Sequence, residues 1–196
     1  MLYCFIKQVM ILSDRDIKSA IKEKKLEFIP KLKSNQIGPA SIDLKLSNVF
    51  KVFNVEKQSL LDIRKGLPKD FTKTYKLKNG EHFVLHPHGF ILASTIEFIK
   101  VSDDMVLRVE GKSSLARMGI LVHTAGFVDP GFKGTITLEI SNQSNLAVAL
   151  YPRMNICQIA VHSMTSPAEV PYNKRKTSLY MNQSEPTGAN TKNLLR

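Results

Sequence analysis

The chain alternates hydrophobic and polar residues with a period of two in many short runs. In "SIDLKL", Ile42, Leu44 and Leu46 alternate with polar neighbours. Because a period of two places successive side chains on opposite faces of a strand, this run predicts a half-buried strand. Similar runs follow, separated by Gly, Pro and Asn: "VFKVF", "EHFVL", "FILASTIEFIKV", "MVLRVE", "GTITLEI", "LAVALY" and "NICQIAV". The pattern predicts a mainly β fold, a distorted jelly roll or β-barrel.

One helix is expected near the N-terminus. Ser13 is a typical N-cap residue, and Asp14 and Asp16 would lie at the positive end of the helix dipole. The apolar stripe that follows predicts a helix ending near Lys24 or Lys25. Elsewhere the sequence predicts only small helical turns.

Three segments differ from the expected β domain, which covers residues 10–171. Residues 1–9 form an apolar N-terminal extension that is too short for a signal peptide. Residues 54–80 are polar and basic, and predict an excursion or hairpin that ends in an Asn-Gly turn. Residues 172–196 form a polar tail that we expect a ligand or a neighbouring subunit to order.

The composition is that of an ordinary globular protein. The 196 residues suffice for one domain, with 43% hydrophobic and 23% charged residues. No apolar run reaches the roughly 18–20 residues that span a bilayer, so a cytoplasmic location without a membrane partner is expected. The two cysteines, Cys4 and Cys157, are far apart, which argues against a disulfide framework and a cysteine-built zinc site.

The net charge of +11 suits a polyanionic ligand. The basic residues are spread over several short clusters, without the long basic arm or interleaved aromatic stripe of single-strand binders. Nucleic acid is therefore the less favoured ligand. A nucleotide triphosphate fits the charge equally well.

Glu139 is the first candidate for chemistry. In "GTITLEI" it shares the polar face of a strand with Thr135 and Thr137. One interpretation is an ordinary solvated face. The other is a pocket wall, because the glycines of the preceding loop, "HTAGFVDPGFKG", allow a ligand to approach the backbone.

The second candidate is "EGKSSLARMG" at 110–119. If this stretch is a helical turn, Ser113 and Arg117 share one face, and hydroxyls, a guanidinium and free backbone N–H groups could bind phosphate. The alternative is a capped short helix whose arginine pairs with a surface carboxylate. The GxxxxGK[ST] motif of a Walker loop is absent.

Three histidines are further candidates for a functional role. His86 and His88 lack a third metal ligand at local spacing, so a surface loop is the better interpretation. His123 stands beside the glycine-rich loop, where it is either a neighbour of a ligand or a structural residue.

Four stretches together resemble the dCTP deaminases, which belong to the superfamily of the trimeric dUTPases: "GPASIDLKL", "EGKSSLARMGI", "HTAGFVDPGFKGTITLEI" and "PYN…YMNQ". The similarity runs from about Met10 to Thr187. The resemblance implies a homotrimeric dUTPase-like β fold and a cytosine deaminase that works without zinc. The group removed would be the cytosine amino group of the substrate dCTP, which would be bound with Mg2+. The resemblance also implies dTTP as a feedback inhibitor.

The resemblance also assigns catalytic roles. Glu139 would take a proton from water and deliver it to the substrate. Ser113, Arg117 and the carbonyl of Ala125 would hold the water, and Arg117 would offset the developing charge.

The remaining substrate contacts follow from the same resemblance. Asp129 would bind the 3′-hydroxyl, and the backbone at Thr137 and Leu138 would read the base. Tyr172 and Gln183 would belong to the tail that closes over the nucleotide. The triphosphate-binding turn comprises Lys112, Ser113, Ser114, Leu115, Ala116 and Arg117, in part from a neighbouring subunit.

The chain departs from the family pattern at several positions. His123 and Thr124 adjoin where the family has one more residue, which bears on catalytic geometry and dTTP feedback. Lys112 replaces an arginine, which keeps the charge and loses the bidentate fork. Leu179 and Arg153 stand where Lys and Gly are usual.

Two products are consistent with the resemblance. We expect dUTP, with a bifunctional enzyme that releases dUMP and pyrophosphate as the alternative, in which Asp129 would orient a second water. The remote alternative is a non-catalytic nucleotide or nucleic-acid binding protein.

Overall fold

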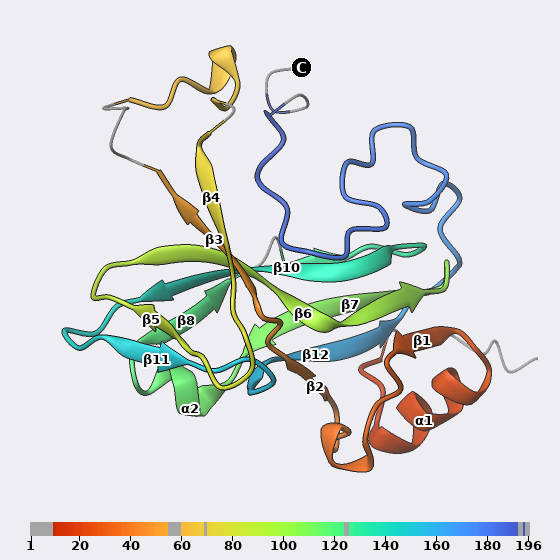
Figure 1. Ribbon diagram of the computed structural model, residues 1–196. Helices are drawn as coiled ribbons and strands as arrows, with labels where there is room; N and C mark the ends of the chain where they lie inside the picture. The colour runs from red at the N-terminus through yellow and green to blue at the C-terminus, as the bar shows by residue number, and fades with distance from the viewer. Residues whose placement is uncertain (1–9, 55–59, 69, 124–125, 192–193, 195–196) are drawn as a thin grey trace, which may run out of the picture.

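A computed structural model describes residues 10–54, 60–68, 70–123, 126–191 and 194. The fold is mainly β, as the sequence predicts, and its strands form three sheets. Two large sheets pack face to face, and α1 (Asp14–Lys22) lies at one end of them (Figure 1). In the described residues, the strands form separate sheets and not the closed barrel that was one of the expected forms.

The six-stranded sheet contains β10, the strand that carries Glu139. Its strands run in the order β4-β3-β6-β10-β8, and β1 pairs with the end of β6 on the edge opposite β10. The bounds are β1 (Leu26–Ile29), β3 (Val49–Phe53), β4 (Thr72–Lys76), β6 (Phe90–Val101), β8 (Ile120–His123) and β10 (Lys133–Asn142).

The other strands form a four-stranded sheet, ordered β2-β12-β7-β9, and the pair β11-β5. The bounds are β2 (Ile42–Lys45), β5 (Phe83–Leu85), β7 (Met105–Gly111), β9 (Phe127–Val128), β11 (Val148–Leu150) and β12 (Asn155–Ser163). Short helical turns are η1 (Ser34–Gln36), η2 (Ile63–Lys65) and α2 (Ser113–Ala116).

The predicted N-terminal helix is confirmed. Ser13 caps α1 by accepting a hydrogen bond from the backbone N–H of Asp16, and Ile17 and Ala20 are buried. The helix ends two residues before Lys24, which has a positive φ of 59°. No described helix is long and apolar enough to cross a membrane.

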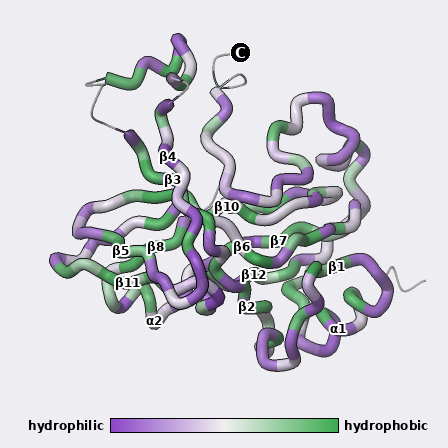
Figure 2. Tube along the Cα trace, viewed as in Figure 1, coloured by the Kyte–Doolittle hydropathy of each residue, from purple (hydrophilic) through white to green (hydrophobic). Residues whose placement is uncertain are grey.

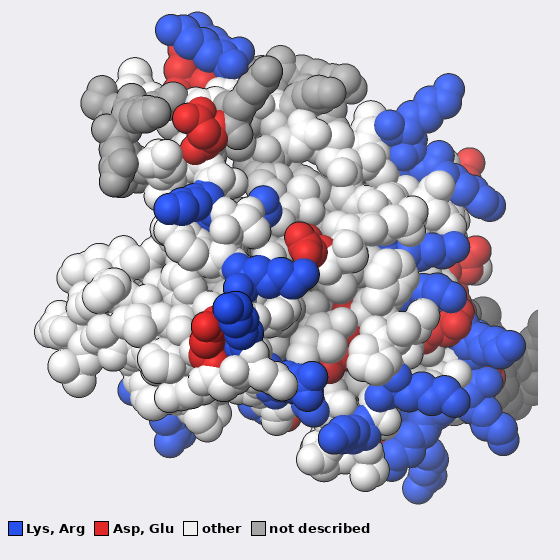
Figure 3. Space-filling model, in the orientation of Figure 1, with Lys and Arg blue, Asp and Glu red and all other residues white. Residues whose placement is uncertain are grey.

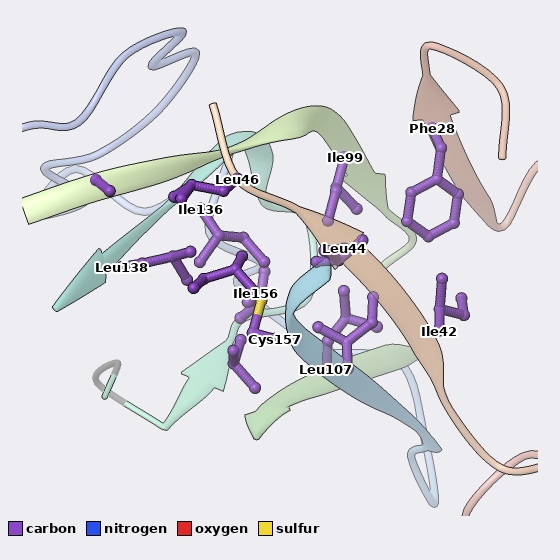
Figure 4. Close-up of a cluster of buried hydrophobic side chains, with 14 of the residues drawn as sticks. Phe28, Ile42, Leu44, Leu46, Ile99, Leu107, Ile136, Leu138, Ile156 and Cys157 are labelled. Atoms are coloured by element: carbon purple, nitrogen blue, oxygen red, sulfur yellow. The ribbon is translucent and has the colours of Figure 1, made fainter. Parts of the chain in front are cut away.

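The core lies between the two large sheets. Figure 4 shows buried side chains from both large sheets meeting there, among them Leu44 of β2, Leu107 of β7 and Leu138 of β10. Cys157 is also fully buried here, as predicted, and burial raises the pKa of its thiol. The alternation of Ile42, Leu44 and Leu46 therefore predicted the buried face of β2 correctly. Figure 2 shows the hydrophobic residues following the strands, whereas the tail is largely hydrophilic.

The segment expected as an excursion or hairpin contains β4, which pairs with β3 from Val49–Lys76 to Phe53–Thr72. The Asn-Gly pair falls in the turn between β4 and β5. The segment thus supplies the second strand of a hairpin whose first strand, β3, precedes it, and the Asn-Gly pair follows β4 instead of joining the two strands.

Asn142, at the end of β10, holds the β5 and β11 regions together. Its amide nitrogen donates to the carbonyl oxygens of Leu85 and Leu146 at 2.9 and 2.8 Å. Its amide oxygen accepts from the backbone N–H and the hydroxyl of Ser144 at 2.9 and 2.8 Å. The side chain is fully buried, so water cannot replace these bonds.

Replacement of Asn142 by alanine should therefore lower the free energy of unfolding by about 3 kcal/mol, because the hydrogen bonds of a fully buried amide to Leu85, Leu146 and Ser144 are lost. Urea denaturation would measure the loss. Asn145→Ala is the matched control, since Asn145 is exposed. An equal effect of the two substitutions would contradict the role given to Asn142.

Candidate active site

A cavity of about 520 Å³ lies between β6, β10, the loop before β10 and the C-terminal tail. This volume is within the range of small-molecule sites. Two carboxylates, Asp129 and Glu139, line it together with apolar and aromatic residues that include Phe53, Phe90 and Phe132. The cavity therefore offers acid groups beside flat apolar surfaces.

Glu139 is brought to the cavity by its place in the middle of β10. Its Cα partners are Leu92 of β6 and His123 of β8. Leu138 and Ile140, the residues on either side, are fully buried in the core. The period of two thus turns Glu139 to the opposite face, and that face is a pocket wall rather than an ordinary solvated surface.

His123 is a close neighbour of Glu139 across the sheet. Residues directly opposite in an antiparallel pair project from the same face, so the imidazole and the carboxylate leave the sheet on one side. His123 is exposed. The expectation that it neighbours the site is supported by this register. His86 and His88 are exposed in the β5–β6 turn, in agreement with the surface-loop interpretation.

Asp129 lies in the tight loop that leads into β10. The backbone N–H of Phe132 donates to the carbonyl oxygen of Asp129 at 3.1 Å, which closes the turn. Gly131 has a φ of 79°, a left-handed conformation that glycine adopts without strain. A Cβ at this position would lie 2.8 Å from Oδ1 of Asn173 and 2.9 Å from Cβ of Pro171. The loop and the start of the tail therefore pack too closely for a side chain.

Substitution Gly131→Ala should destabilise the protein and detach the start of the tail, because it adds both backbone strain and a steric clash. Gly80→Ala is the matched control: its φ of 84° is similar, but a Cβ there meets no atom within 4 Å. We expect a loss of about 1 kcal/mol for the control and about 2 kcal/mol or more for Gly131→Ala. Denaturation measures the stabilities, and limited proteolysis reports the tail. Equal losses with an undisturbed tail would contradict the packing argument.

The tail is held against β10 by hydrogen bonds from Gln183. The backbone N–H of Thr135 donates to the Gln183 carbonyl oxygen at 2.8 Å, and the Gln183 amide donates to the Thr135 carbonyl oxygen at 2.8 Å. Further along, the backbone N–H of Thr187 donates to the Thr137 hydroxyl at 3.2 Å. Thr137, Gln183 and Thr187 all line the cavity, so the tail forms one of its walls.

Tyr172 lines the cavity and organises the tail behind it. Its hydroxyl oxygen accepts from the backbone N–H groups of Leu179 and Tyr180 at 3.2 and 3.1 Å. Its carbonyl oxygen accepts from the Ser178 hydroxyl at 2.7 Å, and its ring contacts that of Phe132. The residue therefore joins the loop before β10 to the tail.

The second predicted constellation, residues 112–117, does not line this cavity. The stretch forms the expected helical turn, α2, whose Leu115 is buried and whose Ser113, Ser114, Ala116 and Arg117 are exposed. The ammonium group of Lys112 binds the Asp43 carboxylate at 2.6 Å. Glu139 lines the cavity and the α2 turn does not, so the two predicted halves of the site are separate within one chain.

The remaining predicted residues divide as follows. Asp129, Thr137, Glu139, Tyr172 and Gln183 are brought together around the cavity. The side chain of Leu138 points into the core, so only its backbone could serve a ligand. Ala125 and Thr124 lie outside the described residues.

Sequence reasoning missed several residues of the cavity wall. Phe53 and Phe90 have ring centroids 5.5 Å apart, and Phe53 also meets Phe71 at 5.1 Å in an edge-on contact. The aromatic residues at the ends of the predicted strands were the available signal. Tyr180 gave no such signal, because it lies in a polar tail.

The ionisable side chains in the cavity wall are acidic. Among its described lining residues the ionisable carboxyl groups are Asp129 and Glu139, and no lysine or arginine is present. In the described parts of the chain no group of three or more His, Cys, Asp and Glu side chains is placed to hold a metal ion. The cavity can therefore bind a polar, largely uncharged group, and a phosphate chain would need cations from elsewhere.

The fold and the site thus define a mainly β protein with a cavity of small-molecule size, whose wall contains a carboxylate from β10 and residues of the C-terminal tail. Residues 11–164 match the model of the dCTP deaminase-like family. The chain belongs to this family.

Known relatives agree over most of the chain. It is 50% identical over 182 residues to a dCTP deaminase, dUMP-forming, from Dictyoglomus turgidum, covering 92% of this chain and 94% of the relative. It is 44% identical over 190 residues to a protein of the same name from Methanobrevibacter smithii, covering 93% and 95%.

The fold also has a solved counterpart. A crystal structure of 2′-deoxycytidine 5′-triphosphate deaminase from Agrobacterium tumefaciens is similar with a TM-score of 0.62 and 24% identity. The match covers 80% of this chain and 49% of that chain. At this identity the likeness supports the fold.

Proposed function

We propose that this protein is a dCTP deaminase that continues to dUMP. The observation that carries the proposal is Glu139, a carboxylate in the wall of a cavity of nucleotide size. The relatives' shared name, dUMP-forming, favours dUMP over the dUTP that the sequence alone favoured.

In the deamination step Glu139 acts as general base and then general acid. It takes a proton from a water molecule whose oxygen attacks C4 of cytosine. It delivers this proton to the ring nitrogen and then transfers the proton of the new C4 hydroxyl group to the amino group, so that the C4–N bond breaks, ammonia leaves and a C4 carbonyl remains. The apolar wall of Phe90 and Leu92 beside it limits access of other water.

Asp129 and the β10 backbone orient the nucleoside. Asp129, at the loop end of the cavity, can accept a hydrogen bond from the 3′-hydroxyl of deoxyribose. The backbone at Thr137 and Leu138 can read the base edge, because the described pairing of β10 with β8 covers residues 139–142 and does not include these two residues. In the second step Asp129 would orient a water that attacks the α-phosphorus, so that pyrophosphate leaves.

The triphosphate requires a second copy of the chain in this proposal. The cavity lacks lysine and arginine among its described lining residues, whereas α2 presents Ser113, Ser114 and Arg117 to solvent. A neighbouring subunit that places its α2 turn over the cavity would supply the missing cations, as a homotrimer allows. Mg2+ arriving with the triphosphate would neutralise part of its charge, and no zinc is needed.

The shared site predicts complementation between two inactive variants. Arg117→Ala and Glu139→Gln should each be inactive alone. After random mixing of equal amounts, about a quarter of all sites would combine an intact Arg117 from one chain with an intact Glu139 from its neighbour. Ammonia release from co-refolded variants measures this recovery. Failure to recover activity, with mixed trimers shown by native mass spectrometry, would place both residues in one chain's site.

The product is tested by incubating the protein with dCTP and Mg2+ and resolving nucleotides by anion exchange. Direct appearance of dUMP and pyrophosphate with little free dUTP supports the proposal. A persistent dUTP peak would show that the protein deaminates dCTP but does not release pyrophosphate from dUTP. Unchanged dCTP would instead favour a binding function.

A further inference from the structure

A second cavity, of about 490 Å³, lies on the other side of the tail from the candidate active site. Five segments line it: residues 47–49 at the start of β3, residues 76–81 at the end of β4 and in the turn after it, residues 95–96 of β6, the turn at 151–153, and tail residues 184–185. Figure 3 shows basic and acidic side chains gathered around a hollow at the centre of the face seen in Figure 1. None of the residues assigned to catalysis or substrate binding lines this cavity.

Arg153 stands at the cavity in an unfavourable backbone conformation. The backbone N–H of Met154 donates to the Tyr151 carbonyl oxygen at 3.3 Å, which closes a turn with Pro152 and Arg153 in the middle. The φ of Arg153 is 72°. A turn with proline first and a positive φ second normally takes glycine at the second position. An arginine there costs stability, and such strain commonly marks a function.

Three cationic side chains line this cavity. Arg153 and Lys78 form no ion pair with the described residues, and Lys76 reaches Glu185 only at 4.0 Å. That pair is weak because both side chains are more than half exposed, at 69% and 53%. The other acid, Glu81, accepts a hydrogen bond from the backbone N–H of Lys78 at 2.7 Å. Two cations thus lack an acidic partner, and the third is loosely held.

We propose that this cavity binds a small phosphate-bearing anion, either free pyrophosphate or the phosphate chain of a nucleotide. Charge-assisted hydrogen bonds from one guanidinium and two ammonium groups match the several oxygens of such a chain. The proposal does not depend on the reaction assigned to the first cavity.

Occupancy of the second cavity acts on the tail. Gln183 and Thr187 line the first cavity, whereas Ser184 and Glu185 line the second. An anion held by Lys76 competes with Glu185 for the same ammonium group. Binding in the second cavity therefore releases the weak contact between Lys76 and Glu185, in the tail segment that both cavities share.

The test is calorimetric titration of the full chain with inorganic pyrophosphate. The titration compares two proteins, the single variant Arg117→Ala and the double variant Arg117→Ala/Arg153→Gly. Both carry Arg117→Ala, which weakens phosphate binding at the α2 turn. We expect Arg153→Gly to weaken pyrophosphate binding about tenfold or more. The same substitution should leave the thermal midpoint unchanged or raise it, because glycine relieves the strain. Absence of pyrophosphate binding to Arg117→Ala protein, or equal binding with Arg153→Gly, would overturn the proposal.

Lys73→Ala is the charge-matched control. Lys73 lies on β4 near Lys76 but outside the cavity, with its ammonium group over the Tyr75 ring. We expect its loss to change pyrophosphate affinity less than about twofold. A loss equal to that of Arg153→Gly would show a general effect of charge and count against the site.

A parallel titration with ATP distinguishes the two sources of phosphate. Tighter binding of pyrophosphate identifies the free anion as the ligand, and tighter binding of ATP identifies a nucleotide. Binding of either ligand that is lost in the Arg153→Gly variant supports the site.

Discussion

Replacement of Glu139 by glutamine is expected to slow deamination of dCTP by about 10³-fold or more while dCTP binding stays within a few-fold of the wild type. Glutamine keeps the size of the side chain and one acceptor oxygen, so the cavity wall is preserved. It cannot take a proton from water, and this is the step that the proposed mechanism assigns to Glu139. The rate of ammonia release measures the first quantity, and calorimetry measures the second.

Glu110→Gln is the matched control for this experiment. Glu110 lies on β7, is exposed, and pairs with Arg108 at 2.7 Å. Its replacement should leave the rate of ammonia release unchanged. A Glu139→Gln variant that releases ammonia at the wild-type rate would remove Glu139 from the chemistry.

Truncation after Pro171 should lower kcat/KM for dCTP by about 10²-fold or more, because the tail supplies one wall of the cavity. The truncated chain loses Tyr172 and Gln183 and exposes the backbone of Thr135 to water. The sheets pair without the tail, so the far-UV circular dichroism should change little. Steady-state kinetics and dCTP titration measure the loss of substrate binding.

The control is a chain that ends after Asn190. It keeps the bond from the Asn190 backbone N–H to the Tyr180 hydroxyl at 3.0 Å and all the tail contacts with β10. We expect near wild-type kinetics from it. Full activity of the chain that ends after Pro171 would show that the tail does not close the site.

The strands of this protein could be predicted where one face is buried. Ile42, Leu44 and Leu46 are all fully buried, as their alternation predicts. The same rule placed Glu139 on the face opposite the core. β1 was missed, because Leu26–Ile29 is only four residues long and gains its strand character from pairing with the distant half of β6.

The site could be predicted only in part, for two physical reasons. The tail is fixed mainly through backbone groups, such as the Thr135 N–H bonded to Gln183, and these groups are common to almost every residue. The distance between the α2 turn and Glu139 depends on how whole sheets pack, which a local pattern does not contain. The positive φ of Arg153, in contrast, had a signal in the sequence, because this residue follows a proline and stands where the family usually has glycine.

The pairing of β10 with the tail also sets the order in which the molecule is completed. The bonds that close the cavity join residues 48 and 50 positions apart, Thr135 to Gln183 and Thr137 to Thr187. During synthesis, at about 5–20 residues per second, the sheets can assemble before the last residues are added. A chain whose synthesis stops short of Gln183 is therefore a folded protein with an unfinished site, which could still join an oligomer and occupy the place of an active subunit.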